Sequence, residues 1–337
     1  MKKEKQPVDW AQVNADLERQ GKFDESTVPY NYDHTVAVDK DYVYLSKKLS
    51  DLLCSGFVRG LVYAFGPLVN ACAFGLKIKG RKYLKAVRGK GAFSVSNHVH
   101  FLDNLVLRQG LRGRKKMFVT VAAFNSKSGL YGKLLRSSGT LPLPDDNLFS
   151  ATRNLNQALS RLIKRKRVIH FYAEHTMWMY YPKPRPFKRG AFFYAAKFNT
   201  PVLPMFLCFT KPKGLRKLFG FKRDAVLQIM PPVLPDPQLP LRDRVTDLQV
   251  RSQLAFIRMY RQFYQIDKAQ IYDIAPEYMD SLNQETALAC KLSELTATDL
   301  SDAECIRLAT EFLATLPRET LSDAHPCATV AESSEQA

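Results

Sequence analysis

The chain has 337 residues, of which 46% are hydrophobic, enough to bury the core of one large α/β domain or of two domains. Its formal net charge is +18 and is unevenly spread, because residues 281–337 carry a net charge of −7 and residues 1–280 carry +25. A body this basic needs an anionic partner, either nucleic acid or an anionic membrane surface. The six cysteines show no paired spacing, which argues against a disulfide framework and indicates reduced thiols in a cytosolic protein.

The N-terminal part of the chain predicts an arm followed by membrane-docking helices. Residues 1–40 are polar and irregular, without the apolar stretch of a signal peptide, and we expect a loosely held arm. Apolar residues then recur at helical spacing, and a nearly continuous apolar run follows over residues 61–76, interrupted by Gly66 and Pro67. That run is shorter than the roughly 20 residues needed to span a bilayer. Residues 41–77 therefore predict an amphipathic helical hairpin that dips into one leaflet, with a helix pair buried against the domain as the alternative.

Residues 78–270 alternate apolar β-type runs with helical patterns. The candidate strands cover the ranges 92–96, 118–124, 168–173, 202–209 and 225–230. The clearest helices are expected over residues 151–164 and 242–265. Strands that are apolar on both faces, with helices between them, predict an α/β domain with a largely parallel or mixed sheet flanked by helices.

Residues 271–337 predict an acidic C-terminal extension. A capping box formed by Ser301 and Glu304 opens a helix that is expected to end near Leu316. The last twenty residues have the composition of a disordered tail.

Basic residues gather in three runs: 112–116, 161–167 and 211–223. The second ends a predicted helix and suits its dipole, so a solvated surface explains it equally well. The third mixes cations with bulky apolar residues, which suits a membrane interface better than a DNA groove, and no familiar nucleic-acid motif occurs. We therefore expect an anionic membrane surface as partner, no nucleic acid, and a peripheral or monotopic location at the cytoplasmic face of a membrane.

His98 and Asp103 are the candidate catalytic pair. His98 follows the predicted strand 92–96, and Asp103 stands five positions later. On an ideal helix five residues turn through roughly 140°, so the two side chains meet only if His98 precedes the helix and Asp103 lies in its first turn. Asp103 would then hold one ring nitrogen of His98 while the other takes a proton. No Ser or Cys nucleophile lies nearby in a recognisable motif, so the activated hydroxyl would belong to the substrate.

Four sequence blocks follow one another in a particular order. They are Asn97-His98 with Asp103, Gly139 to Leu143, Tyr172 to Thr176, and Pro201 to Pro204, with a Phe187 to Ala191 element before the last. This order resembles the glycerolipid acyltransferases, the family that includes 1-acylglycerol-3-phosphate acyltransferase. The resemblance covers roughly residues 78–233, and the helices before it look like the family's membrane-docking hairpin.

The resemblance implies an O-acyltransferase that moves a fatty acyl group from acyl-CoA or acyl-carrier protein to a hydroxyl of a glycerolipid, with the lysophospholipid 1-acylglycerol-3-phosphate as the expected acceptor. It implies no metal and no cofactor. His98 is then the general base, Asp103 orients it, and backbone N–H groups hold the oxyanion. The residues that the resemblance assigns to acceptor binding are Gly139, Glu174, Thr176, Lys188 and Arg189. For Glu174, a structural carboxylate paired with Lys or Arg is the alternative.

Two blocks depart from the family pattern. Asp145 stands where the second block usually has an Arg implicated in binding the acceptor's phosphate. His175 replaces the Gly of the third block, where its side chain is expected to crowd the backbone. Another lysophospholipid or a glycolipid is therefore the alternative acceptor. The cations that could replace the missing Arg are Arg136, Lys183, Arg185, Lys188 and Arg189.

Other chemistries fit parts of the sequence. His100 lies three residues before Asp103 and is the rival base. A metal-dependent hydrolase would use His98, His100 and Asp103 as ligands, completed by His170 or His175. A membrane-surface protein without activity is the third class. No Gly-x-Ser-x-Gly occurs, which disfavours a serine hydrolase.

Overall fold

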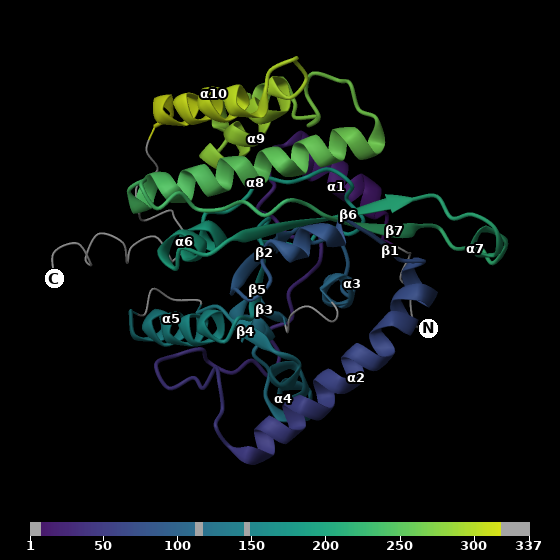
Figure 1. Ribbon diagram of the computed structural model, residues 1–337. Coiled ribbons are helices and arrows are strands. Elements are labelled where there is room, and N and C mark those ends of the chain that lie inside the picture. The colour runs from purple at the N-terminus through teal and green to yellow at the C-terminus, as the bar shows by residue number, and fades with distance from the viewer. Residues whose placement is uncertain (1–7, 112–116, 145–148, 318–337) are drawn as a thin grey trace.

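A seven-stranded sheet forms the centre of the protein, with the strand order β1-β7-β6-β2-β5-β3-β4 (Figure 1). The structure is a computed structural model that describes residues 8–111, 117–144 and 149–317. The strands are β1 (Lys77–Lys79), β2 (Ala92–Ser96), β3 (Met117–Val121), β4 (Thr140–Pro142), β5 (Val168–Tyr172), β6 (Val202–Thr210) and β7 (Asp224–Ile229). Among these described strands the β6–β7 pair alone is antiparallel. The predicted α/β class with a largely parallel, mixed sheet is confirmed.

The sequence predicts five of the strands, and the bounds of β2 coincide with the predicted range. It misses β1 and β4, which have three residues each and lie at the two edges of the sheet. Three residues are too few to show the two-residue alternation by which a strand is identified. The predicted strand 118–124 is too long at its end, because β3 stops at Val121 and the 3-10 helix η2 (Ala123–Asn125) follows.

Helices cover both faces of the sheet. One face packs against α5 (Phe149–Lys164), α6 (Gly190–Lys197) and α8 (Leu241–Tyr264), and the other against α2 (Leu49–Phe74) and α3 (Asp103–Gly110) (Figure 1). α4 (Gly129–Ser138) packs beside α2, and the short α7 (Leu215–Leu218) lies in the connection from β6 to β7.

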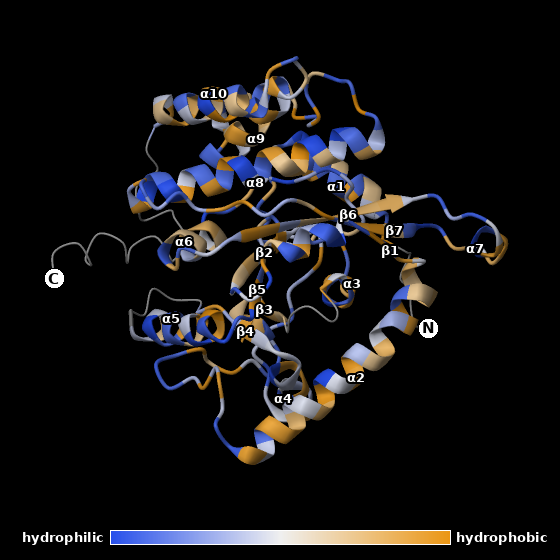
Figure 2. Ribbon diagram, viewed as in Figure 1, coloured by the Kyte–Doolittle hydropathy of each residue, from blue (hydrophilic) through white to orange (hydrophobic). Residues whose placement is uncertain are grey.

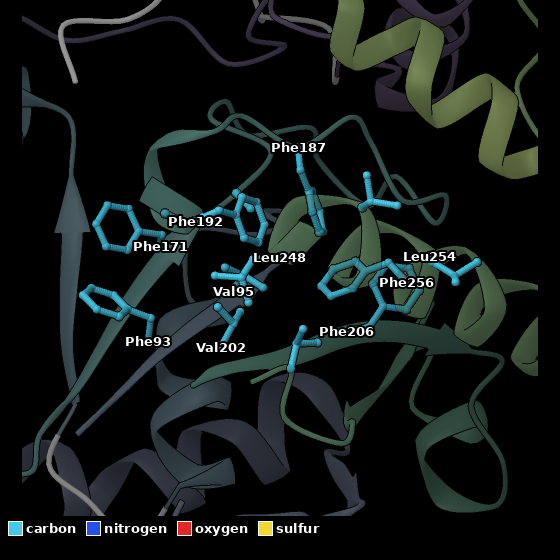
Figure 3. Close-up of a cluster of buried hydrophobic side chains, with 14 of the residues drawn as sticks. Phe93, Val95, Phe171, Phe187, Phe192, Val202, Phe206, Leu248, Leu254 and Phe256 are labelled. Carbon is cyan, nitrogen blue, oxygen red and sulfur yellow. The ribbon is translucent and has the colours of Figure 1, made fainter. Parts of the chain in front are cut away.

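The larger core lies between the sheet and the layer formed by α5, α6 and α8 (Figure 3). Alternate residues of each strand enter it, among them Val95 of β2, Phe171 of β5 and Phe206 of β6. Phe256 of α8 packs between Phe206 and Phe187, with ring centroids 5.1 and 4.7 Å away. The alternate residues of each strand point to the opposite face, where they pack against α2 and α3 in a second, smaller core.

The structure corrects the predicted N-terminal hairpin, because α2 is one unbroken helix of 26 residues. Gly66 and Pro67 lie inside it. The backbone at Gly66 does not adopt a positive φ, and the helix ends only at Gly75, whose φ of 52° makes a left-handed cap. Residues 41–48, expected to begin the first helix, are not helical.

The N-terminal arm is packed on the domain, which corrects the expectation of a loosely held, irregular segment. It contains α1 (Trp10–Arg19), and the buried Phe23 stacks on Trp178 with ring centroids 5.4 Å apart. Nε1 of Trp178 donates to the Glu25 carbonyl at 2.7 Å. The buried Asn14 donates to a backbone carbonyl at 3.0 Å. Polar contacts of this kind leave no hydrophobic pattern in the sequence, which is why the arm reads as irregular.

The C-terminal extension forms α9 (Gln284–Leu295) and α10 (Asp302–Thr315), which pack on α8 (Figure 1). Ser301 and Glu304 form the predicted capping box. The 3-10 helix η3 (Pro276–Ser281) precedes α9, and η1 (Arg81–Lys85) follows β1. The tail 318–337 and the basic run 112–116 lie outside the described residues.

Asn97 ties the end of β2 to β6. Its buried side chain donates from Nδ2 to the Leu207 carbonyl at 2.9 Å, and the Leu207 N–H donates to its Oδ1 at 2.8 Å. The last backbone pair of the two strands joins Ser96 to Met205, so the Asn97 amide extends the ladder beyond it. The backbone leaves the sheet after Asn97, and these hydrogen bonds fix the position of the residue that precedes His98.

We predict that Asn97→Ala lowers the free energy of unfolding by about 2–4 kcal/mol, because it leaves the buried N–H and carbonyl of Leu207 in β6 without hydrogen-bond partners. Urea denaturation measures the loss. Asn154→Ala is the control, since that half-buried side chain only donates, to the carbonyls of Lys40 and Tyr42, and its loss should cost less than about 1.5 kcal/mol. Equal losses in the two variants contradict the role given to Asn97.

Candidate active site

A row of polar side chains lines the face of β2 and β5 that meets α3. The two strands are parallel, with Ser94 opposite His170 and Ser96 opposite Tyr172. Because alternate residues of a strand share a face, these four side chains lie together, and His98 continues the same row beyond the end of β2. The row leads from the buried middle of the sheet to its carboxyl edge, where ligands bind in many α/β folds.

The structure brings His98 and Asp103 together. Nδ1 of His98 lies 2.7 Å from Oδ2 of Asp103. His98 lies in the turn before α3, and Asp103 is the first residue of that helix, as the pairing requires. A carboxylate can only accept a hydrogen bond, so Nδ1 carries the proton and Nε2 keeps its lone pair in the neutral ring. Nε2 is therefore the atom that can take a proton.

Asp103 is the centre of the site's hydrogen bonds. The Tyr172 hydroxyl donates to Oδ1 at 2.6 Å, and the N–H groups of Val99 and His100 donate to Oδ2 at 3.2 and 3.4 Å. Burial alone would raise the pKa of the Asp103 carboxyl, but the charge of His98 and the donated hydrogen bonds outweigh it and hold the pKa below its usual value. Asp103 therefore faces the imidazole as a carboxylate.

Tyr172 also holds the ring of His98. The two rings stack with centroids 3.8 Å apart and planes 16° from parallel. The His98 side chain is 22% exposed, whereas that of Asp103 is 2% exposed. Within the described part of the chain, Nε2 of His98 has no hydrogen-bond partner. The fixed ring thus presents its basic nitrogen to whatever enters from the open side.

Glu174 fixes the start of the His98 turn from inside. Its carboxylate pairs with Nη2 of Arg185 at 3.1 Å and accepts the N–H groups of His98 at 3.3 Å and Arg185 at 2.8 Å. Burial raises the pKa of the Glu174 carboxyl, and the charge and hydrogen bonds of Arg185 oppose that rise. Both side chains are fully buried, so Glu174 is a structural carboxylate paired with an arginine, the alternative that the sequence left open.

Thr176 belongs to the same buried network. Its hydroxyl accepts from Nη1 of Arg185 at 2.7 Å and lies 3.3 Å from the Glu25 carbonyl. Two backbone hydrogen bonds then tie this loop to the histidine turn: the N–H of Trp178 donates to the His98 carbonyl at 3.0 Å, and that of Tyr180 to the Val99 carbonyl at 2.9 Å. The loop that follows the third sequence block thus supports the histidine turn through its backbone.

His175, which replaces the glycine of the third block, is accommodated by an unusual backbone conformation. It adopts the left-handed conformation with a φ of 68°, which glycine favours, and its side chain is exposed. The turn geometry is therefore kept, at the cost of strain in a non-glycine residue.

The rival base His100 is turned away from the Asp103 carboxylate. Its Nδ1 accepts the Leu102 N–H at 3.0 Å, and its ring packs against Phe74 and Tyr180, with centroids 4.9 and 5.4 Å away. Burial lowers the pKa of His100, although the nearby Asp103 opposes this. His98 is thus the histidine that the carboxylate orients.

His170 is buried below the site between two serines. Ser96 donates to the Asn97 carbonyl at 2.9 Å, so its hydroxyl accepts from Nε2 of His170 at 3.2 Å, and Nδ1 accepts from Ser94 at 3.0 Å. Burial lowers the pKa of His170 to about 3, so this ring is neutral. Among the described residues no group of three His, Cys, Asp or Glu side chains is arranged to hold a metal ion.

Three of the residues assigned to acceptor binding lie away from His98. Gly139 caps α4 and precedes β4, level with the middle of β2 and separated from it by β5 and β3. Lys188 pairs with Asp24 at 2.7 Å, and Arg189 donates to Thr246 at 3.2 Å. The structure does not bring these three residues together with the histidine. Asp145, which replaces the expected Arg of the second block, lies outside the described residues.

Sequence reasoning missed the part played by Tyr172, and the signal for it was present. Polar residues recur at every second position in two otherwise apolar strands, at Ser94 and Ser96 and again at His170 and Tyr172. Such a row in a strand buried on both faces marks a polar site facing one layer of helices. What the sequence does not contain is the register that sets Tyr172 opposite Ser96 and so next to Asp103.

Comparison with known proteins identifies the family of the segment that contains this site. Residues 75–207 match the family model described as Acyltransferase. This segment is an acyltransferase-family domain. The structure of the 1-acyl-sn-glycerophosphate (LPA) acyltransferase PlsC from Thermotoga maritima is similar with a TM-score of 0.40 and 20% identity, over 62% of this chain and 83% of that one. No curated protein sequence matches the chain. The family inferred from the four blocks is confirmed, and its domain contains both His98 and Asp103.

Tyr172→Phe tests the hydrogen bond to Asp103 within the acyltransferase domain. Near pH 7 the variant should lose about 1.5–3 kcal/mol of stability, the usual value of a hydrogen bond to a charged group. A carboxyl whose pKa is lowered in the folded state adds stability above its unfolded pKa, and this is lost as pH falls through the folded pKa. Without the hydroxyl the pKa of Asp103 is lowered less, so the loss of stability in acid should be smaller in the variant and should be complete at a higher pH than in the wild type.

Denaturation free energies between about pH 7 and pH 3 measure this shift. Tyr44→Phe is the matched control, because its hydroxyl donates to the Pro142 carbonyl at 3.0 Å and, among the residues that the structure describes, contacts no carboxylate. An equal loss of stability over this pH range in wild type, Tyr172→Phe and Tyr44→Phe contradicts the link between Tyr172 and Asp103.

Proposed function

We propose that this protein is an O-acyltransferase that moves a fatty acyl group from a thioester donor, acyl-CoA or acyl-carrier protein, to a hydroxyl of a lysophospholipid. The observation that carries the proposal is the His98–Asp103 pair, whose geometry leaves Nε2 of His98 basic and unpartnered within the described chain. The acyltransferase-family match over residues 75–207 supports the reaction class. The proposed acceptor is 1-acylglycerol-3-phosphate, the acceptor of the similar PlsC enzyme.

The reaction follows from the position of the base. Nε2 of His98 takes the proton of the acceptor hydroxyl as its oxygen attacks the thioester carbonyl. The tetrahedral oxyanion then collapses, the carbon–sulfur bond breaks, and the imidazolium returns the proton to the departing thiolate. Asp103 stabilises the imidazolium between the two steps and keeps the ring oriented. The sequence of steps needs neither a metal ion nor a covalent enzyme intermediate.

The exposed surface of α2 and α7 is the proposed membrane-docking surface. α2 is long and apolar enough to cross a membrane, and hydrophobic residues recur along its ribbon (Figure 2). Large apolar side chains are exposed along it and at α7. They are Leu49, Leu52, Leu53, Phe57, Leu61, Phe65, Leu68 and Val69 of α2, and Leu215, Leu218 and Phe219 at α7. Four exposed lysines lie in or beside α7, which suits an anionic leaflet: Lys211, Lys213, Lys217 and Lys222.

We infer that α2 lies in the membrane interface and does not cross the bilayer. Its opposite side is held by the domain, where Gly66, Asn70 and Phe74 are buried and Asn70 donates to Gln109 of α3 at 2.6 Å. A helix packed along α3 and α4 cannot cross a bilayer without carrying the domain with it. The protein is therefore proposed to be monotopic, at the cytoplasmic face.

We predict that His98→Ala lowers kcat by roughly 10²–10⁴, the usual contribution of a positioned base. His100→Ala should keep kcat within about tenfold of wild type, because its ring is not paired with the Asp103 carboxylate. The measurement is ester formation by mass spectrometry, with purified protein, acyl-CoA or acyl-carrier protein, and a panel of lysophospholipids, glycerol phosphate and glycolipids. Wild-type rates in His98→Ala, or no new ester on any acceptor with the wild type, contradict the proposal.

We also predict that replacing both Leu53 and Phe57 with Glu weakens binding to anionic vesicles at least tenfold. These side chains are 66% and 68% exposed on α2, so the change removes apolar contact and adds charge at the lipid boundary without disturbing the core. Leu234→Glu is the control, since Leu234 is 54% exposed and lies outside the docking surface. Vesicle cosedimentation compares the three proteins, and equal binding by all of them contradicts the assignment of this surface.

A further inference from the structure

The proposed acceptor carries a phosphate, and the five cations considered from the sequence are engaged elsewhere. Each makes a contact that holds the fold. Arg136 donates to the Lys127 carbonyl, Lys183 pairs with Glu18, Arg185 with Glu174 and Lys188 with Asp24, and Arg189 donates to Thr246. A cation that binds acceptor phosphate should be exposed, held in place, and at the same edge of the sheet as His98.

Arg223 lies at that edge. β6 runs parallel to β2, with Met205 opposite Ser96, and continues to Thr210, which pairs with Asp224 at the start of β7. Arg223 directly precedes Asp224, so it lies just beyond the carboxyl edge from which the His98 turn emerges. Its side chain is exposed.

Tyr180 holds the Arg223 guanidinium toward the histidine turn. The guanidinium carbon lies 4.4 Å from the centroid of the Tyr180 ring, and that ring lies 5.4 Å from the ring of His100. The backbone of Tyr180 is fixed by its hydrogen bond to the Val99 carbonyl, next to His98. It has a φ of 60°, a strained value for a tyrosine, and such strain gathers at functional sites.

Arg223 also keeps its charge available. In the described part of the chain no carboxylate lies within ion-pair distance of it, because Asp224 beside it pairs with Arg216 at 2.6 Å. A guanidinium whose carbon lies over an aromatic ring can still donate two N–H groups to two oxygens of a phosphate.

The surroundings of Arg223 fit a lipid that stays in the membrane. Arg216, in the same β6–β7 connection, donates to the carbonyls of Ala71 and Cys72 at 3.1 and 2.7 Å and so ties α7 to the end of α2. The β6–β7 connection thus contacts the end of α2 through Arg216 and, through Arg223, the Tyr180 ring beside the His98 turn. A lipid with its acyl chain among the exposed side chains of α2 and α7 would carry its headgroup past Arg223.

We propose that Arg223, stacked on Tyr180, binds the phosphate monoester of the lipid acceptor and so sets the preference for a phosphorylated acceptor. The inference rests on the proposed acyl transfer and adds a headgroup site to it. Asp145 occupies the place where the second block of the family usually has an Arg. In this protein Arg223, in the β6–β7 connection, would bind the phosphate instead.

The test uses Arg223→Gln with a short-chain, monomeric 1-acylglycerol-3-phosphate and the matching 1-acylglycerol as acceptors. The ratio of kcat/KM for the phosphorylated over the unphosphorylated acceptor should fall 10–100-fold, chiefly through a higher KM, as expected for loss of a charge-assisted pair. Tyr180→Leu should reduce the ratio in the same direction by a smaller factor. Lys82→Gln is the control, because Lys82 also lies over a tyrosine ring, with Nζ 5.1 Å from the centroid of Tyr83. Lys82 follows β1, which runs parallel to β7, so it lies near the end of β7, whereas Arg223 precedes the start of β7.

An unchanged ratio in Arg223→Gln overturns the inference while leaving acyl transfer by the wild type intact. A second arm measures binding to anionic vesicles that lack acceptor. Arg223→Gln should bind them as the Lys82→Gln control does; weaker vesicle binding with an unchanged ratio means that Arg223 contacts bilayer phosphates, which also overturns the inference. A wild type that acylates neither acceptor nor any member of the wider panel ends the proposed function itself.

Discussion

A buried carboxylate is the constraint around which the site is built. Asp103 is 1% exposed, and an isolated carboxylate in such a place would be strongly destabilising. Its two oxygens are instead satisfied by an imidazole, a phenol and two backbone N–H groups. Because the imidazole is one of these partners, the hydrogen bond that satisfies the buried carboxylate also orients the base. The first turn of α3 can pack on the sheet only if His98 points its Nδ1 inward.

The rest of the fold keeps the partners of Asp103 in place. Asn97 extends the β2–β6 ladder by side-chain hydrogen bonds, which fixes where the histidine turn begins. The Glu174–Arg185 pair holds the first N–H of that turn, and the N-terminal arm covers the pair from outside through contacts with Trp178. The described cations near the core hold fold contacts, and the exposed ones around α7 stay available for anionic partners.

The sequence predicts the central pair because its geometry is local. His98 lies in the turn after a strand and Asp103 in the first turn of the next helix, so their contact can be predicted without knowing how the strands pair. Tyr172 could not be placed in the same way, since its contact with Asp103 depends on the register between β5 and β2, which are more than seventy residues apart in sequence. The same limit applies to Arg223, whose position follows from β7 pairing antiparallel with β6. The hairpin prediction failed for another reason: Gly66 and Pro67 weaken a helix, but packing against α3 and α4 keeps α2 continuous.

The account stands on the claim that Asp103 keeps the proton on Nδ1 of His98 and so leaves Nε2 basic. Asp103→Asn is nearly isosteric, yet its amide can donate to Nδ1 and favour the other tautomer. Single-turnover acyl transfer by this variant, in a protein whose thermal unfolding stays cooperative, is the direct measurement. The account predicts a rate lower by about 10²–10⁴. A rate within twofold of wild type, with folded protein, would contradict it.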